Sequence, residues 1–266
     1  MKNPWLHRSA ILLAILTLIV IGLGASVTSE IRPLPGVTAP SAEVVSAPGL
    51  EQAHRIGGYA VALLTLGLAI WYSCLIGWIA LAVVIIESVL GGVPIIHAWL
   101  SPIFFTLVVV IAVLTSRGWQ DGPVLIENQW KRLRPVASAV PILVVIQIGL
   151  GAAFRHNAMG VLVHILNAMI VLLVILVAGM VALRQYPEHP SLRPAAIALL
   201  IITGVQVLLG FSVYMVLLVS SENNLGLIIT GVMHVFNGAL TLAASAVLTM
   251  QIHRNLKVTD RSVTSS

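Results

Sequence analysis

Long apolar runs follow one another along almost the whole chain, separated by short polar stretches. The hydrocarbon core of a bilayer is about 30 Å thick, so a helix needs about 20 predominantly apolar residues to cross it. Eight runs approach or reach that length, and the shortest is the third. They cover residues 10–28, 50–71, 75–91, 94–115, 136–154, 158–183, 194–219 and 225–251. The pattern predicts an all-α integral membrane protein with eight transmembrane helices.

The composition excludes a soluble domain. Hydrophobic residues make up 59% of the chain and charged residues 9%, with a mean hydropathy of +1.04, whereas soluble domains carry about 25% charged residues. We expect the first run to be a retained span, because Thr28-Ser29-Glu30 is a poor signal-peptide cleavage site; an uncleaved signal anchor is the alternative. Cys74 is the only cysteine, so no disulfide can form within the chain.

The net charge of +5 indicates orientation rather than nucleic-acid binding. If the N-terminus is cytoplasmic, eight spans leave only Arg32, Arg55 and Arg155 outside, and the remaining basic residues face the cytoplasm. An excess of Lys and Arg on one side is the usual mark of the cytoplasmic side. We therefore expect both termini to be cytoplasmic and the protein to be a multi-pass protein of the plasma membrane.

The chain divides into two sets of four predicted spans. The expected units are an N-terminal half (1–116), a basic cytoplasmic connector (117–135) and a C-terminal half (136–266). Short motifs recur in both halves, which favours duplication and two pseudo-symmetric four-helix bundles. These motifs are [EQ]xxLG at 87–91, 147–151 and 206–210, and HxxN at 164–167 and 234–237.

Four of the eight histidines lie inside predicted spans, one on each even-numbered span. At 1.5 Å per residue, all four fall in the outer half of the bilayer. An imidazole in hydrocarbon is costly unless it is paired or ligated. A hydrogen bond to a neighbouring helix would explain one such residue, but four at matched depth favour metal ligation. They are His54, His97, His164 and His234, whereas His7, His156, His189 and His253 are expected to be solvated or interfacial.

The number of ligands per half distinguishes between metals. Zinc usually takes three or four protein ligands gathered in one place. Haem iron accepts two axial histidines from facing helices. Small residues one turn from each histidine leave room for a porphyrin, although they also suit ordinary helix packing in membranes. They are Gly57, Gly58, Ser101, Gly160, Ala168, Gly231 and Gly238. The sequence predicts two haem sites, one per half, toward the extracytoplasmic side.

The second predicted span opens with the sequence Glu51-Gln52-Ala53-His54-Arg55. This ExxHR form, the alternating histidines and the [EQ]xxLG motifs resemble the haem A synthase family over residues 10–252. The resemblance implies that one half binds haem b as a cofactor and the other receives haem O. It further implies a haem-dependent oxidoreductase that oxidises a methyl group of haem O to the formyl group of haem A, the terminal oxidase cofactor.

The resemblance also assigns roles to residues. It implies that His164 and His234 ligate haem b, and that His54 and His97 hold the substrate haem with Glu51 as the catalytic carboxylate. Glu51 and His54 share a helix face; the alternative is that Glu51 only marks a helix start. Arg55 and Arg155 are expected to bind haem propionates or to be interfacial. Glu87 is expected to be interfacial, with proton handling as the minor alternative.

One departure from the family concerns the first outer loop, which lacks the cysteine pair of many members. The expected partners are membrane lipid, haem O synthase and terminal oxidase assembly proteins, and the electron donor is open. An alternative is a non-catalytic dihaem cytochrome b that passes electrons between quinol and a membrane partner. A transporter is disfavoured, because no chain of acidic and basic residues crosses the inner half of any span.

The predicted orientation is testable with reporter fusions. A reporter fused after Arg134 should be cytoplasmic, and one fused at Ala39 should be outside. The reverse result at either position would contradict the charge-based orientation.

Overall fold

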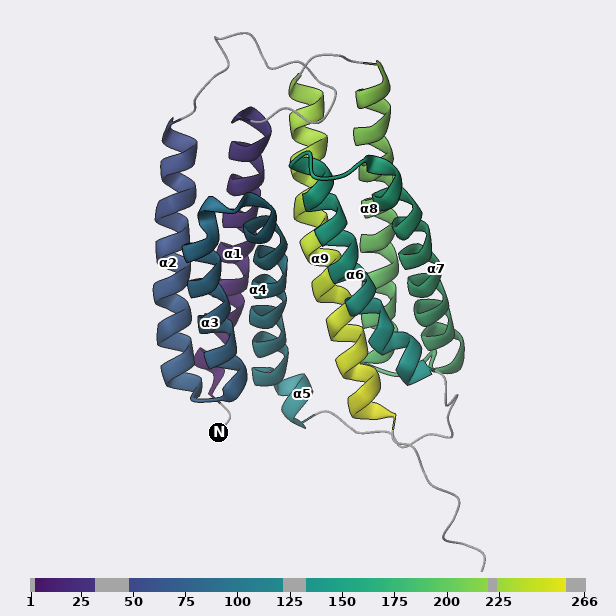
Figure 1. The fold of residues 1–266 in the computed structure, drawn as a ribbon. Helices are drawn as coiled ribbons and strands as arrows, with labels where there is room; N and C mark the ends of the chain where they lie inside the picture. Colours follow the sequence, from purple (N-terminus) through teal and green to yellow (C-terminus); the bar gives the residue numbers. More distant parts are fainter. Residues whose placement is uncertain (1–2, 32–47, 122–132, 220–223, 257–266) are drawn as a thin grey trace, which may run out of the picture.

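The fold was analysed in a computed structural model, which describes residues 3–31, 48–121, 133–219 and 224–256. Regular structure in these ranges is entirely helical (Figure 1). The elements are α1 (Pro4–Ile31), α2 (Pro48–Tyr72), α3 (Leu75–Val89), the 3-10 helix η2 (Leu90–Gly92), α4 (Pro94–Thr115), α5 (Arg117–Asp121), α6 (Leu133–Arg155), α7 (Val161–Gln185), α8 (Leu192–Val219) and α9 (Leu225–Asn255). Eight segments of this described part are long and apolar enough to cross a membrane. The eight predicted spans are confirmed.

Several helices, among them α1 and α9, extend beyond the apolar runs that predicted them, whereas α3 ends and α7 begins inside its run. α1 begins at Pro4, where a proline is tolerated because the first backbone N–H groups of a helix lack partners anyway. α9 begins after Asn224, whose side chain accepts a hydrogen bond from the Leu227 N–H at 3.0 Å. It continues to Asn255, which is fully buried. Hydropathy therefore located the spans, whereas capping and packing determine where the helices end.

Two turns lie lower than the helix ends beside them. α3 has 15 residues, about 22 Å at 1.5 Å per residue, and η2 turns the chain into α4. In Figure 1 this turn lies below the upper ends of α1 and α2. The turn between α6 and α7 likewise lies below the upper ends of α8 and α9. α4 and α7 therefore start deeper in the molecule than α2 and α9.

Each set of four long helices has its own hydrophobic core. One core cluster draws its buried residues from α1–α4 and another from α6–α9 and the residues that flank them. A third, smaller cluster joins Ile21 of α1 and Phe105 of α4 to Ala239 and Ala243 of α9. The two sets pack together through these small α9 residues, which let the three helices approach closely.

Two hydrogen bonds also cross between the two sets of helices. The indole N–H of Trp99 on α4 donates to the Val145 carbonyl on α6 at 2.8 Å. The Arg155 guanidinium at the end of α6 donates to the Thr28 carbonyl on α1 at 2.9 Å. Both bonds satisfy polar groups at positions where helices from different halves meet.

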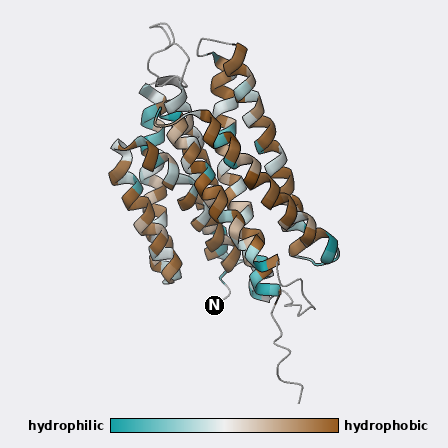
Figure 2. Ribbon diagram, turned by 45° about the vertical axis from the view of Figure 1, so that its right-hand side comes forward, coloured by the Kyte–Doolittle hydropathy of each residue, from teal (hydrophilic) through white to brown (hydrophobic). Residues whose placement is uncertain are grey.

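The outer surface of the helices is strongly apolar. Large hydrophobic side chains are exposed on every long helix, including Leu63 of α2 and Leu173 of α7. Figure 2 shows hydrophobic residues along the length of the helices and hydrophilic residues gathered toward their ends. Such a surface suits lipid rather than water, which agrees with a multi-pass membrane protein.

Two features differ from the sequence-based expectations. His189, expected to be solvated or interfacial, is 4% exposed. Its Nδ1 accepts backbone N–H groups from Ser191 at 3.1 Å and Leu192 at 3.2 Å, so the ring serves the start of α8, where backbone donors lack helical partners. The expected connector (117–135) contains α5 and the first residues of α6. Residues 32–47 of the first outer loop and residues 122–132 of the connector lie outside the described part.

The packing of α9 yields a stability prediction. Ala239 is fully buried, so Ala239→Leu should overpack the contact with Ile21 and Phe105 and cost about 1–3 kcal/mol. Thermal unfolding in detergent should show the loss, whereas Ala60→Leu, at an exposed α2 position, should unfold near the parent temperature. Equal melting of both variants would contradict this packing.

Candidate functional site

The structure brings the four intramembrane histidines together in two pairs. His54 of α2 and His97 of α4 have ring centroids 6.0 Å apart, and their planes are nearly perpendicular at 89°. His164 of α7 and His234 of α9 have centroids 6.3 Å apart and an angle of 78°. Each pair joins two even-numbered spans of one half.

The low turns at η2 and between α6 and α7 explain how the paired histidines reach the same depth. His97 and His164 are each the fourth residue of their helices, which begin low in Figure 1. His54 is the seventh residue of α2 and His234 the tenth of α9, and these helices begin higher. His54 and His234 lie further along their helices than His97 and His164 do, and this compensates for the lower starts of α4 and α7.

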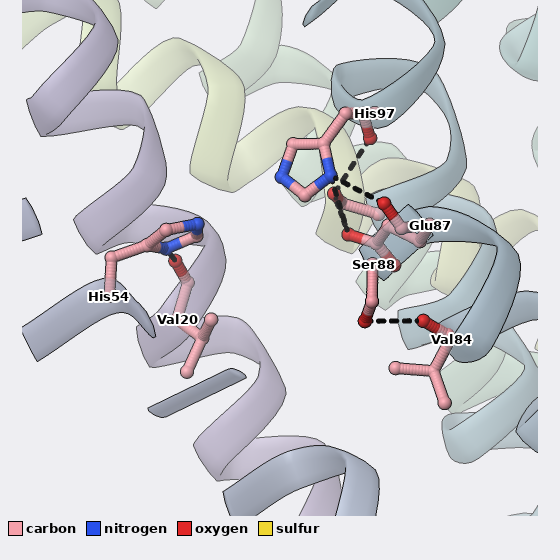
Figure 3. Close-up of polar contacts among 7 residues, drawn as sticks. Val20, His54, Val84, Glu87, Ser88 and His97 are labelled. Carbon is pink, nitrogen blue, oxygen red and sulfur yellow. Dashed lines mark hydrogen bonds and ion pairs between the residues drawn. The ribbon is translucent and has the colours of Figure 1, made fainter. Parts of the chain in front are cut away.

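The first pair is oriented by backbone carbonyls. Nδ1 of His54 lies 3.0 Å from the Val20 carbonyl oxygen, and Nδ1 of His97 lies 3.2 Å from that of Glu87. A carbonyl can only accept, so each Nδ1 carries the hydrogen and each Nε2 keeps a free lone pair. Figure 3 shows the two rings turned toward one another. This is the tautomer and support that metal-binding histidines commonly have.

A cleft lies between these two rings and the helices around them. Apolar side chains and a glycine form most of its wall, while Glu87, Ser88, Ser101 and Thr17 contribute polar groups. Ligand sites are typically clefts that are mostly apolar and carry a few convergent polar groups. The lining residues are Thr17, Val20, Ile21, His54, Gly58, Val61, Val84, Glu87, Ser88, His97, Ser101 and Phe104.

Glu87 is the carboxylate in this cleft, and its expected interfacial position is wrong. Its side chain is 12% exposed. The Ser101 hydroxyl, one turn after His97, donates to the carboxylate, and Oε1 lies 3.8 Å from Nδ1 of His97. Hydropathy alone could not distinguish a glutamate at the membrane surface from one whose side chain faces the next helix, here α4.

The second pair is held by side-chain amides. Gln147 Nε2 lies 3.1 Å from Nδ1 and 3.2 Å from Nε2 of His164, and its Oε1 accepts from Asn167 at 2.8 Å. This bond from Asn167 points the amide nitrogen of Gln147 toward the imidazole. The HxxN motif is thereby explained, because the asparagine one turn after the histidine orients the glutamine.

The same arrangement recurs around the other ring of this pair. Gln206 Nε2 lies 3.4 Å from Nε2 of His234, and Gln206 Oε1 accepts from Asn237 at 2.9 Å. Both rings also interact with the backbone carbonyl of their glutamine, as the rings of the first pair do with the carbonyls of Val20 and Glu87. The side-chain amides are an addition that only the second pair has.

In the copies at 147–151 and 206–210, the final glycine of the motif makes space for a ring. A methyl group added at Gly151 would lie 3.0 Å from Cε1 of His164, and one at Gly210 would lie 3.0 Å from Cε1 of His234. α1 contains a fourth copy that sequence reasoning missed, Val20-Ile21-Gly22-Leu23-Gly24. There a methyl group on Gly24 would lie 2.7 Å from Cε1 of His54. The [EQ] requirement hid this copy, because Val20 acts through its carbonyl.

The other predicted site residues do not line the cleft. Glu51 and Arg55 are exposed, with their side chains 56% and 65% accessible, and they form an i,i+4 pair at 3.9 Å. Arg155 binds the Thr28 carbonyl at the end of α6. Their predicted catalytic and propionate-binding roles therefore stay predictions.

The ring geometry fits a metal held by two ligands. Two imidazoles that bind one metal ion from opposite sides through Nε2, each at about 2.0 Å, have centroids about 6 Å apart. Both pairs match this spacing. No group of three or more His, Cys, Asp or Glu residues suited to a metal ion occurs within the described ranges.

The two pairs differ in how directly they could bind iron. Nε2 of His54 and of His97 has no hydrogen to displace. Binding at Nε2 of His234 would replace the long contact from Gln206, which would keep its bond to Asn237. The chain matches no protein-family model, and no curated protein matches it.

The close approach of Gly24 to His54 gives a prediction for the first pair. Gly24→Ala should push the ring off its preferred rotamer at a cost of about 0.5–1.5 kcal/mol, which lowers hemin affinity by up to about tenfold. Hemin titration of the purified protein measures the effect. Gly67→Ala, where a methyl group meets nothing within 4 Å, is the matched control, and equal affinities for both variants would contradict the proposed role of Gly24.

Proposed function

We propose that this protein is a haem-dependent membrane oxidoreductase that oxidises the methyl group of haem O to the formyl group of haem A. The observation that carries the proposal is the arrangement of four intramembrane histidines in two pairs, with ring centroids 6.0 and 6.3 Å apart. The resemblance of the ExxHR and [EQ]xxLG motifs to the haem A synthase family supports the choice of reaction. Two pseudo-symmetric four-helix bundles in the plasma membrane, with cytoplasmic termini and extracytoplasmic haem sites, complete the proposal.

In this proposal the two pairs have different tasks. His164 and His234 would hold haem b, which supplies redox chemistry when bound. The amide partners Gln147 and Gln206, each fixed by an asparagine, make this a rigid site suited to a resident cofactor. His54 and His97 would hold the substrate haem O. Their cleft is partly open and contains fewer side-chain amides, which suits a ligand that must enter and leave.

The residues of the cleft would orient the substrate and limit its exposure to water. The Val20 and Glu87 carbonyls fix the two rings, so the substrate porphyrin would be held in one plane between them. Apolar side chains such as Val61 and Phe104 line the cleft and exclude water. Glu51, one turn before His54, would have to leave its partner Arg55 in order to act on the bound substrate.

A second function is favoured by the exposure of Glu51. A non-catalytic dihaem cytochrome b, which passes electrons between a quinol and a membrane partner, needs the histidine pairs but no carboxylate at the porphyrin edge. The exposed pairing of Glu51 with Arg55 agrees with that alternative. The identity of the haem that the protein releases distinguishes the two functions.

Co-expression with a haem O source tests the reaction. The parent chain should yield haem A, identified by chromatography and mass. His54→Ala or His97→Ala should abolish haem A while the b-type spectrum of the other pair persists, and His164→Ala or His234→Ala should abolish most of that spectrum. The ring of His253 is exposed and lies near Ser138, far from both pairs. The control variant His253→Ala should therefore behave as the parent. Unchanged haem O in all samples would exclude the enzyme.

Glu51→Gln distinguishes a catalytic carboxylate from a helix-start residue. The exchange keeps the shape and removes the charge, so the fold and the bound haem b should persist. Removing a preorganised charge from a reacting centre typically costs about 10²–10³ in rate, so haem A should fall by that factor while haem O or a partly oxidised haem accumulates. Haem A production near the parent rate would end the catalytic role of Glu51.

A further inference from the structure

Glu87 places a carboxylate inside an apolar helix near one histidine pair. Its side chain is 12% exposed, whereas that of Glu51 is 56% exposed. A carboxylate within a membrane-spanning segment is costly, and where one occurs it usually has a partner and a functional role. The partners of Glu87 are therefore the place to look for its role.

Both oxygen-bearing groups of Glu87 face His97. The backbone carbonyl accepts the Nδ1 hydrogen at 3.2 Å, and the carboxylate Oε1 lies 3.8 Å from the same nitrogen. The Ser101 hydroxyl donates to the carboxylate and lies 2.9 Å from the His97 carbonyl oxygen. The carbonyl of Glu87 thus fixes the tautomer of His97, and the carboxyl group of Glu87 lies beside the ring, as Figure 3 shows.

The repeated motif shows that this charge is particular to one site. Its first position contacts the adjacent histidine in all four copies, and the residues there are Val20, Glu87, Gln147 and Gln206. The backbone carbonyl at this position interacts with the ring in each copy, and the two glutamines add a neutral amide. Among the four copies only Glu87 brings an acidic side chain to the ring of a histidine.

We propose that Glu87 is a positioning residue for His97 and lowers the reduction potential of a haem held by His54 and His97 below that of a haem held by His164 and His234. The inference rests on the bis-histidine ligation of the proposed function. A carboxylate beside Nδ1–H raises the basicity of the ligating Nε2. A negative charge near the iron also stabilises its ferric form over its ferrous form, and an apolar cleft screens that charge weakly.

Redox titration of the purified full-length protein loaded with hemin tests the proposal. The parent should show two components, and His54→Ala should remove the one of lower potential. Glu87→Gln gives this position the residue of the other half, so the ring keeps its backbone carbonyl and the charge is lost. The lower component should then shift to higher potential and approach the other, which stays in place. Ile86→Ala, at the exposed neighbour of Glu87 on α3 that does not line the cleft, should shift neither.

The reciprocal exchange protects the test against a misfolded variant. Gln147→Glu should lower the potential of the His164–His234 component and leave the other unchanged. If both exchanges leave the potentials in place, or if His54→Ala removes the higher component, the proposal is wrong. If hemin does not bind the His54–His97 pair at all, this inference and the proposed ligation both fall. A protein that shows the predicted potentials but forms no haem A would contradict only the proposed reaction.

Discussion

An imidazole inside a membrane helix needs partners for its two ring nitrogens. This structure contains four such imidazoles, and the neighbouring helices supply their partners. The membrane core offers no water to bind an unpaired nitrogen. In the first pair, backbone carbonyls of the preceding helix take both Nδ1 hydrogens, which leaves both Nε2 lone pairs facing across the cleft. In the second pair, glutamine amides contact the rings. Three of the rings approach the neighbouring helix so closely that the position there must be a glycine, namely Gly24, Gly151 and Gly210.

Much of this arrangement could be predicted from the sequence, because hydropathy and depth are local properties. The eight spans and the four intramembrane histidines follow from the length of the apolar runs and the rise of a helix. The pairing of His54 with His97, and of His164 with His234, followed from the assumption that each half is a unit. The meaning of the [EQ]xxLG motif could not be predicted, because it depends on which face of each odd-numbered helix meets the next histidine. The same gap hid the copy at Val20–Gly24 and led to the wrong position for Glu87.

The two sites differ in chemistry although they share a plan. The C-terminal pair has a closed network in which Asn167 and Asn237 fix the glutamines that contact the rings. In the N-terminal pair the residue three after His54 is Gly57, which packs against Val20, and Ser101, four residues after His97, is bonded to Glu87. The smaller side chains leave a cleft there, and Glu87 lines it. This difference is the physical reason for assigning exchangeable haem to one half and resident haem to the other.

The central claim is that each histidine pair can hold one haem iron from both sides. Electron paramagnetic resonance of the oxidised, hemin-loaded protein, combined with the haem-to-protein ratio, tests this claim most directly. The account predicts two haems per chain, both low-spin, with the strong anisotropy that nearly perpendicular axial imidazoles produce. A high-spin signal from either haem, or uptake of a single haem by the parent chain, would contradict it.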